Sequence, residues 1–419
     1  MRYRLPQFSR LQWLCLLAVV GLQACIGISI RASDLLTAPT PMRLAFVITL
    51  EALLLLVLLA VVRQRFINAA VVVYFLLAIN FAITPWYARQ KVNISLAPNV
   101  DLYVKIMGDV MPGFTDTSHV TTDAKGFRTT KRVNYDAKDS YRIFAIGGST
   151  TEQIYLDDAK TWTALLERDL PQYLNRPVEV INAGVSGLRS EHHLAMLRQV
   201  SQYKPDMVIF MMGLNDWNSH IIQKLNPPPI EWDFTKSLLW KGLLALKPIQ
   251  KPGELPNQGG KDSPRLEYGE YYSSQNNSLT RPDVREVRFD DVAPEYKALA
   301  GKIFEECKKQ HYRCVFLTHP TAYSREVAPE LKKRLWMTPP NQPFTVTLDS
   351  LIHVSGLYND WLYAAAKESG FEACDLGSQI PPTTDYLYDD CHFNEGGAKR
   401  VAELLRACIG GSQMQVTIQ

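Results

Sequence analysis

The distribution of hydrophobic positions divides the chain into two parts. Three long apolar stretches fill the first quarter: Leu11–Ile30, Leu44–Val62 and Phe66–Trp86. Each is close to the ~20 residues with which a helix crosses a bilayer. From Tyr141 onward, short apolar runs alternate with helical, half-polar segments. We therefore predict a membrane anchor over residues 1–90 and a main domain over residues 141–410.

The main domain has the pattern of an α/β protein. The run Asp206–Met212 is apolar throughout, as expected for a strand covered on both faces. Strands and helices alternate, which predicts a parallel sheet with right-handed crossovers. The expected strands are Arg142–Ile146, Val178–Asn182, Asp206–Met212, Cys314–Thr318 and Phe371–Leu376. The expected helices are Thr161–Tyr173, Ser190–Tyr203, Pro294–Gln310, Leu357–Ser369 and Asn394–Cys408.

Two segments lack this regularity. Residues 91–140 are polar and rich in turn signals, and we interpret them as an irregular, partly β collar beside the membrane. The motif Gly126–Thr129 within the collar suggests no particular chemistry. Residues 217–291 carry proline and glycine clusters without lasting periodicity, which is typical of a lid, a substrate-binding insert or disorder.

Basic residues set the expected orientation of the anchor. Arginines occur in Met1–Arg10, and Arg63 and Arg65 lie between the second and third stretches. Short basic loops stay in the cytoplasm, so we expect everything after about Tyr87 to be outside. A cleaved signal peptide or a lipid anchor at Leu22–Cys25 is the alternative for the first stretch.

Composition excludes some classes of function. The net charge of +3 is small and the basic residues are scattered, so no nucleic-acid surface is expected. No cysteine or histidine spacing indicates a zinc site. Cys307 and Cys314 flank a helix-to-strand turn and could pair in an oxidising compartment. Cys374, Cys391 and Cys408 complete an odd set of five, whose pairing stays open.

Four polar motifs follow predicted strands. Gly147-Gly148-Ser149 follows the first, and a turn with Gly187 follows the second. Asn215 follows the third, and Asp389 and His392 follow the last. The carboxyl ends of parallel strands form the edge where open α/β sheets bind ligands. Each motif also has a structural interpretation: Ser149 with Glu152 fits a capping box, and Asn215 fits a turn or helix cap.

Together these residue types suit acyl transfer. A serine needs an imidazole to take its proton, and a carboxylate orients that imidazole. The N–H groups of Ser149 and Gly187 and the Asn215 amide would stabilise an oxyanion. In these motifs the chain resembles the SGNH/GDSL hydrolases, in a membrane-anchored bacterial form. Gly148 departs from the family, which usually has Asp there.

The resemblance implies a three-layer α/β/α sandwich and a serine ester hydrolase with a Ser149–His392–Asp389 triad. It implies no metal or organic cofactor. Location and resemblance suggest an O-acyl, in particular O-acetyl, ester on a cell-surface polysaccharide or glycolipid. An acyltransferase with the same triad and an idle scaffold among envelope polysaccharide-assembly proteins are the alternatives. The sequence does not determine the ester, the role of the insert or the oligomeric state.

Three other histidines lie near these motifs. His192 and His193 start the helix after Gly187, and we expect them on its solvated face. His319 ends a strand and is a weaker alternative base, because no carboxylate stands near it in the sequence.

Overall fold

The computed structural model describes residues 94–106, 111–114, 117–131, 133–137, 139–226, 266–267, 283–339 and 342–414. The three apolar stretches, the boundary at Tyr87 and most of the 217–291 insert lie outside these ranges. Within them, no helix combines the length and apolarity needed to cross a membrane.

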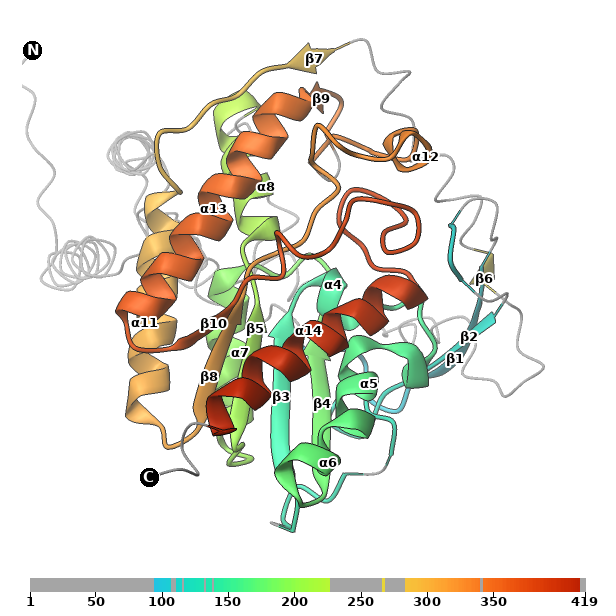
Figure 1. Ribbon diagram of the computed structural model, residues 1–419, viewed down its shortest axis with the longest axis vertical. Coiled ribbons are helices and arrows are strands. Elements are labelled where there is room, and N and C mark those ends of the chain that lie inside the picture. The colour runs from blue at the N-terminus through green and yellow to red at the C-terminus, as the bar shows by residue number, and fades with distance from the viewer. Residues whose placement is uncertain are drawn as a thin grey trace, which may run out of the picture. The chain divides into compact units, whose positions relative to one another are not determined.

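A five-stranded parallel sheet forms the centre of the fold (Figure 1). Its strands are β3 (Tyr141–Gly147), β4 (Val178–Gly184), β5 (Met207–Met211), β8 (Arg313–Leu317) and β10 (Glu372–Cys374). Their order is β10-β8-β5-β3-β4, and every neighbouring pair is parallel. The chain turns to opposite sides of β3 to make β4 and β5, so the switch point lies at the carboxyl end of β3.

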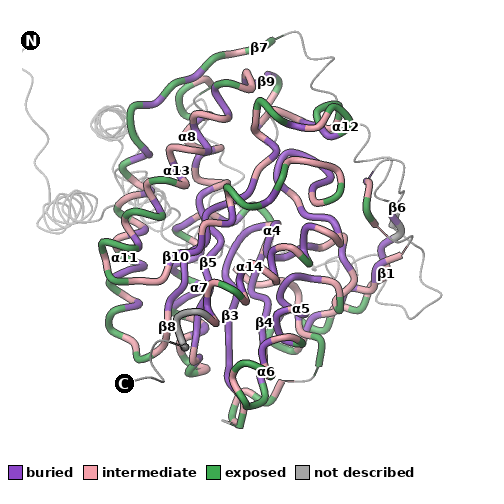
Figure 2. Tube along the Cα trace, viewed as in Figure 1, coloured by how far each residue is buried: buried purple, intermediate pink, exposed green. Residues whose placement is uncertain are grey.

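Helices cover both faces of the sheet. The side chains of β3 alternate: Phe144 and Ile146 belong to one hydrophobic cluster, Ile143 and Ala145 to the other. The first cluster is completed by α7 (Ser190–Ser201), α8 (Leu214–Leu225), α11 (Pro294–Lys309) and α13 (Leu348–Glu368). The second is completed by α5 (Trp162–Asp169) and α14 (Glu395–Met414). The strands are buried between these layers (Figure 2), which is the predicted α/β/α arrangement.

Several helix boundaries differ from the predicted ones. Pro171 ends α5 and starts α6 (Pro171–Leu174), because proline cannot continue the hydrogen-bond ladder of a helix. The helix predicted from Leu357 begins at Leu348, where the Thr347 hydroxyl accepts from the N–H of Ser350. Helix α8 continues into the segment predicted to be an irregular insert from residue 217. It is helical there because Trp217 and Ile221, one turn apart, are both buried in the core.

Short strands and helices complete the fold. The collar contributes β1 (Asp101–Lys105) and the antiparallel β2 (Thr117–Thr121), and β6 (Leu266–Glu267) pairs parallel with β1. The remaining short elements are α4 (Ser149–Glu152), η2 (Asp158–Lys160), β7 (Val284–Arg285), α12 (Pro329–Lys332) and β9 (Thr345–Val346).

Two disulfides tie helices to strands. Cys307–Cys314 joins α11 to β8, as the sequence suggested. Cys374–Cys408 joins β10 to α14. Of the cysteines in the described ranges, Cys391 alone is unpaired, and it is buried.

Candidate active site

Ser149 is the first residue of α4, at the carboxyl end of β3. Gly147 and Gly184 let this short helix sit directly on the strand ends: a Cβ on either would overlap atoms of Thr151, and one on Gly184 would also overlap Glu152. The capping-box interpretation is wrong, because Gly148 is the N-cap and no side chain caps the helix. The Ser149 hydroxyl is free to make a different contact.

That contact is with His392. The Ser149 Oγ lies 2.7 Å from His392 Nε2. On the other side of the ring, Nδ1 lies 2.7 Å from Asp389 Oδ2 and 2.9 Å from Oδ1. The N–H groups of Cys391 and His392 also donate to Asp389 Oδ1, at 2.9 and 2.8 Å. The structure thus brings the three predicted triad residues into one hydrogen-bonded chain.

The surroundings of His392 stabilise the protonated form of its ring. Burial lowers its pKa, but the Asp389 carboxylate beside the ring outweighs this and raises the pKa well above 6.5. Asp389 itself is 1% exposed, and its Oδ1 accepts from two N–H groups of the loop that carries His392. A buried, fixed carboxylate of this kind stabilises an imidazolium.

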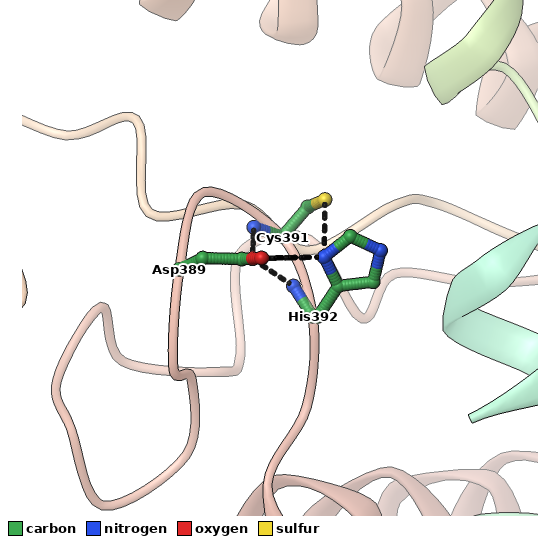
Figure 3. A group of neighbouring side chains, drawn as sticks. All are labelled: Asp389, Cys391 and His392. Carbon is green, nitrogen blue, oxygen red and sulfur yellow. Dashed lines mark hydrogen bonds and ion pairs between the residues drawn. The ribbon is translucent and has the colours of Figure 1, made fainter. Parts of the chain in front are cut away.

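Cys391 adds a thiol to this pair (Figure 3). Its Sγ lies 3.6 Å from His392 Nδ1, and burial raises the pKa of the thiol to about 11. Asp389, Cys391 and His392 each offer a possible metal ligand. However, the 2.7 Å separation of Nδ1 and Oδ2 is that of a charge-assisted hydrogen bond. Two ligand atoms of a tetrahedral zinc ion would stand roughly 3.3 Å apart, so Nδ1 and Oδ2 as placed are too close together to share one.

The oxyanion candidates lie on two neighbouring segments. Asn215 is in the first turn of α8, just after β5, and its Nδ2 donates to the carbonyl of Leu188 at 3.0 Å. It is not a helix cap, since Gly213 holds that position. Gly187 precedes Leu188 with φ of 77°, a conformation that favours glycine. Asn215, Leu188 and Ser149 line the same small cavity.

Glu152 holds the Gly187 turn against α4, the helix that begins with Ser149. Its Oε2 accepts from both the N–H and the hydroxyl of Ser186, each at 2.5 Å. Burial raises the pKa of this carboxyl, and the hydrogen bonds from Ser186 only partly offset the effect. The sequence analysis singled out Glu152 only as the third residue after Ser149 in a capping-box pattern. That pattern gave no sign that its side chain faces the Gly187 turn.

Arg128 secures the segment that follows α4. This buried side chain donates to the carbonyls of Glu152, Gln153 and Leu156 at 2.6 to 2.8 Å and pairs with Asp158. Its backbone also makes two 3.0 Å hydrogen bonds with Asn182 of β4. The motif Gly126–Thr129, to which no chemistry was assigned, therefore contributes a residue that fixes the segment just after Ser149.

The expectation for His193 is wrong. It is 2% exposed, not on a solvated helix face, because α7 turns it toward the strand ends. His192 is half-buried and accepts from the N–H of Arg189. His319 is 2% exposed, and its Nε2 lies 2.9 Å from Thr150 Oγ1 rather than at Ser149. Burial lowers the pKa of His319 to about 4.

With this geometry established, the comparisons identify the family. The GDSL-like Lipase/Acylhydrolase family matches residues 145–400. The chain belongs to this family. It is accordingly a serine ester hydrolase, and the resemblance noted in its four motifs is confirmed. No curated protein sequence matched the chain.

Several solved structures are similar at low identity. Axe2, an acetylxylan esterase from Geobacillus stearothermophilus, is 15% identical with a TM-score of 0.37, covering 65% of this chain and 97% of its own. LAE5, an alpha/beta hydrolase enzyme from the metagenome of Lake Arreo in Spain, is 17% identical with a TM-score of 0.35, covering 66% and 97%. A GDSL-like lipase from Bacteroides thetaiotaomicron is 14% identical with a TM-score of 0.33, covering 67% and 93%. The family assignment rests on the family match and not on these structures.

Proposed function

We propose that this GDSL hydrolase is a membrane-anchored, extracytoplasmic esterase that removes O-acetyl groups from a cell-surface polysaccharide or glycolipid. Ser149 is the nucleophile, His392 the general base and acid, and Asp389 the residue that orients the imidazole. The observation that carries this assignment is the 2.7 Å contact at each end of the His392 ring.

The reaction follows from these contacts. As Ser149 Oγ bonds to the ester carbon, its proton passes to His392 Nε2, and the carbonyl oxygen becomes an oxyanion. Collapse of this intermediate breaks the bond to the sugar oxygen, which takes the proton from His392 and leaves. Water then attacks the acetyl-serine and gives a proton to His392. Collapse of this second intermediate breaks the bond to Ser149 Oγ, which takes the proton back from His392, and acetic acid leaves and ionises to acetate. Asp389 stays ionised and balances the imidazolium in both steps.

The N–H groups of Ser149 and Gly187 and the Asn215 amide are assigned to the oxyanion. As the first residue of a helix, Ser149 has an N–H without an acceptor inside that helix. Such donors lower the barrier because the charge that they meet develops only in the transition state. Asn215 would exchange its contact with the Leu188 carbonyl for one with the oxyanion.

The location outside the cytoplasm is supported by two features. Disulfides persist in oxidising compartments, and four cysteines of the described ranges form two of them. The arginine distribution favours the same orientation. In intact spheroplasts, added protease should digest the region after Tyr87, and full protection would contradict the proposed topology.

An acetate-release assay tests the activity. The purified chain should release acetate from O-acetylated polysaccharide in water, and Ser149→Ala should release none. If acetate instead moves to an added sugar acceptor and little is freed, the enzyme is an acyltransferase with the same triad. If wild type forms neither product from any acetyl ester, the scaffold alternative is favoured.

A further inference from the structure

A small cavity lies beside Ser149 at the carboxyl end of the sheet. It has a volume of about 10 Å³, which is room for about one water-sized group. Its lining includes Ser149 and Asn215, together with His193, His319, Met211 and Met212. A larger surface depression of about 490 Å³, lined by Thr130 and Pro171, contains no residue of the triad.

The acyl group of a bound ester must lie near this cavity. In the tetrahedral intermediate, the acyl carbon is bonded to Ser149 Oγ and its oxyanion faces the Asn215 amide. Both side chains border the cavity, so the substituent on that carbon has this space next to it. We propose that this cavity is the acyl pocket, that it admits acetyl and excludes longer acyl chains, and that His193 sets the limit. This rests on the esterase function proposed above.

Three of the other residues that line the pocket, Met211, Met212 and His319, are held rigidly. Met211 and Met212 are 1% and 2% exposed at the end of β5, in the core of the domain. His319 is fixed at four points: Nε2 contacts Thr150 Oγ1 at 2.9 Å, Nδ1 contacts the Pro320 carbonyl at 3.0 Å, and its N–H and carbonyl both bond Asn359. A longer acyl chain would have to displace close-packed groups, which is costly.

His193 differs from the rest of the wall. It is buried, yet neither ring nitrogen has a hydrogen-bond partner in the described part of the chain. Burial lowers its pKa to about 3, so the ring is neutral at the pH of turnover. Buried polar groups are normally paired, and an unpaired one that lines the same cavity as Ser149 suggests a role in shaping the site. No hydrogen-bond network depends on this ring, so its volume can be changed by itself.

The test is a chain-length profile with p-nitrophenyl acetate, propionate and butyrate. Wild type should show a kcat/KM for acetate at least about tenfold above that for butyrate, since a surplus methylene in a pocket that is already filled costs about this much or more. His193→Ala should bring the two values close together. His193→Leu, which keeps most of the volume, should retain the preference for acetate. His311→Ala is the control, because His311 is exposed elsewhere on the molecule.

Three results would overturn the pocket. First, wild type could hydrolyse butyrate at the same rate as acetate, a result that does not depend on whether any variant folds. His193→Ala could keep the wild-type ratio at an unchanged melting temperature. His193→Leu could lose the preference as fully as the alanine variant, which would show that hydrogen bonding and not volume sets it. In all three cases esterase activity persists, whereas failure of wild type on every ester would contradict the proposed function itself.

Discussion

Replacement of Asn215 by alanine separates an oxyanion role from a structural one. In the structure the Asn215 amide has a visible structural task, since it donates to the Leu188 carbonyl at 3.0 Å and so links α8 to the Gly187 turn. If this were all, Asn215→Ala would lose one ordinary hydrogen bond, worth about 0.5–1.5 kcal/mol of stability. That loss corresponds to a melting temperature lower by a few degrees, at about 2–4 °C per kcal/mol.

An oxyanion role predicts a different effect. A single donor of this kind contributes about 10²–10³-fold to kcat, or about 3–4 kcal/mol of transition-state stabilisation. The amide meets the charge only in the transition state, so KM should change little. We therefore expect kcat of Asn215→Ala to fall by about 10²–10³-fold while the melting temperature falls only slightly.

The assay is steady-state hydrolysis of p-nitrophenyl acetate beside a thermal melt. Asn226→Ala is the matched control: it lies at the end of the same helix, and its amide donates to Gln342 at 2.8 Å, away from Ser149. It should lose stability without losing kcat. A destabilised Asn215→Ala with kcat within a fewfold of wild type would refute the oxyanion assignment.

Two further predictions concern the groups around the triad. The ring of His392 must be neutral to accept the serine proton, and Asp389 raises its pKa well above 6.5, so kcat/KM should rise with pH through a midpoint above that value. A flat profile, or a midpoint at or below 6.5, would contradict a histidine base held by Asp389. Glu152→Ala should lower kcat by up to about 10²-fold, since the Gly187 turn loses both Ser186 contacts, and Glu152→Gln, which keeps an acceptor, should lower it less. Equal kcat in wild type and Glu152→Ala would show that these contacts do not position the turn.

The sheet could be predicted because its strands are buried on both faces. Continuous apolar runs such as Met207–Met211 leave few alternatives, and the five observed strands lie within a residue or two of the predicted ones. The order of motifs after the strands was also sufficient to predict that Ser149, Asp389 and His392 lie together, because the carboxyl ends of parallel strands meet at one edge of the sheet.

Helix boundaries and supporting residues were harder to predict. Helix α13 begins at Leu348, where a Thr347 cap decides the start, and this local hydrogen bond is weakly encoded in periodicity. Glu152 and Arg128 act through partners 34 and 24 positions away, Ser186 and the Glu152 carbonyl. His193 was misassigned because an amphipathic helix can turn either flank of its apolar stripe inward, and only packing shows which.

Labelling of Ser149 tests the central claim most directly. A fluorophosphonate forms a covalent bond only with an activated serine, which here requires His392 within hydrogen-bond distance of Oγ. Wild type should incorporate one probe, and peptide mass spectrometry should locate it on Ser149. Ser149→Ala should take up none while its melting temperature stays near that of wild type. Labelling of another serine, or unchanged labelling of the folded alanine variant, would contradict the account.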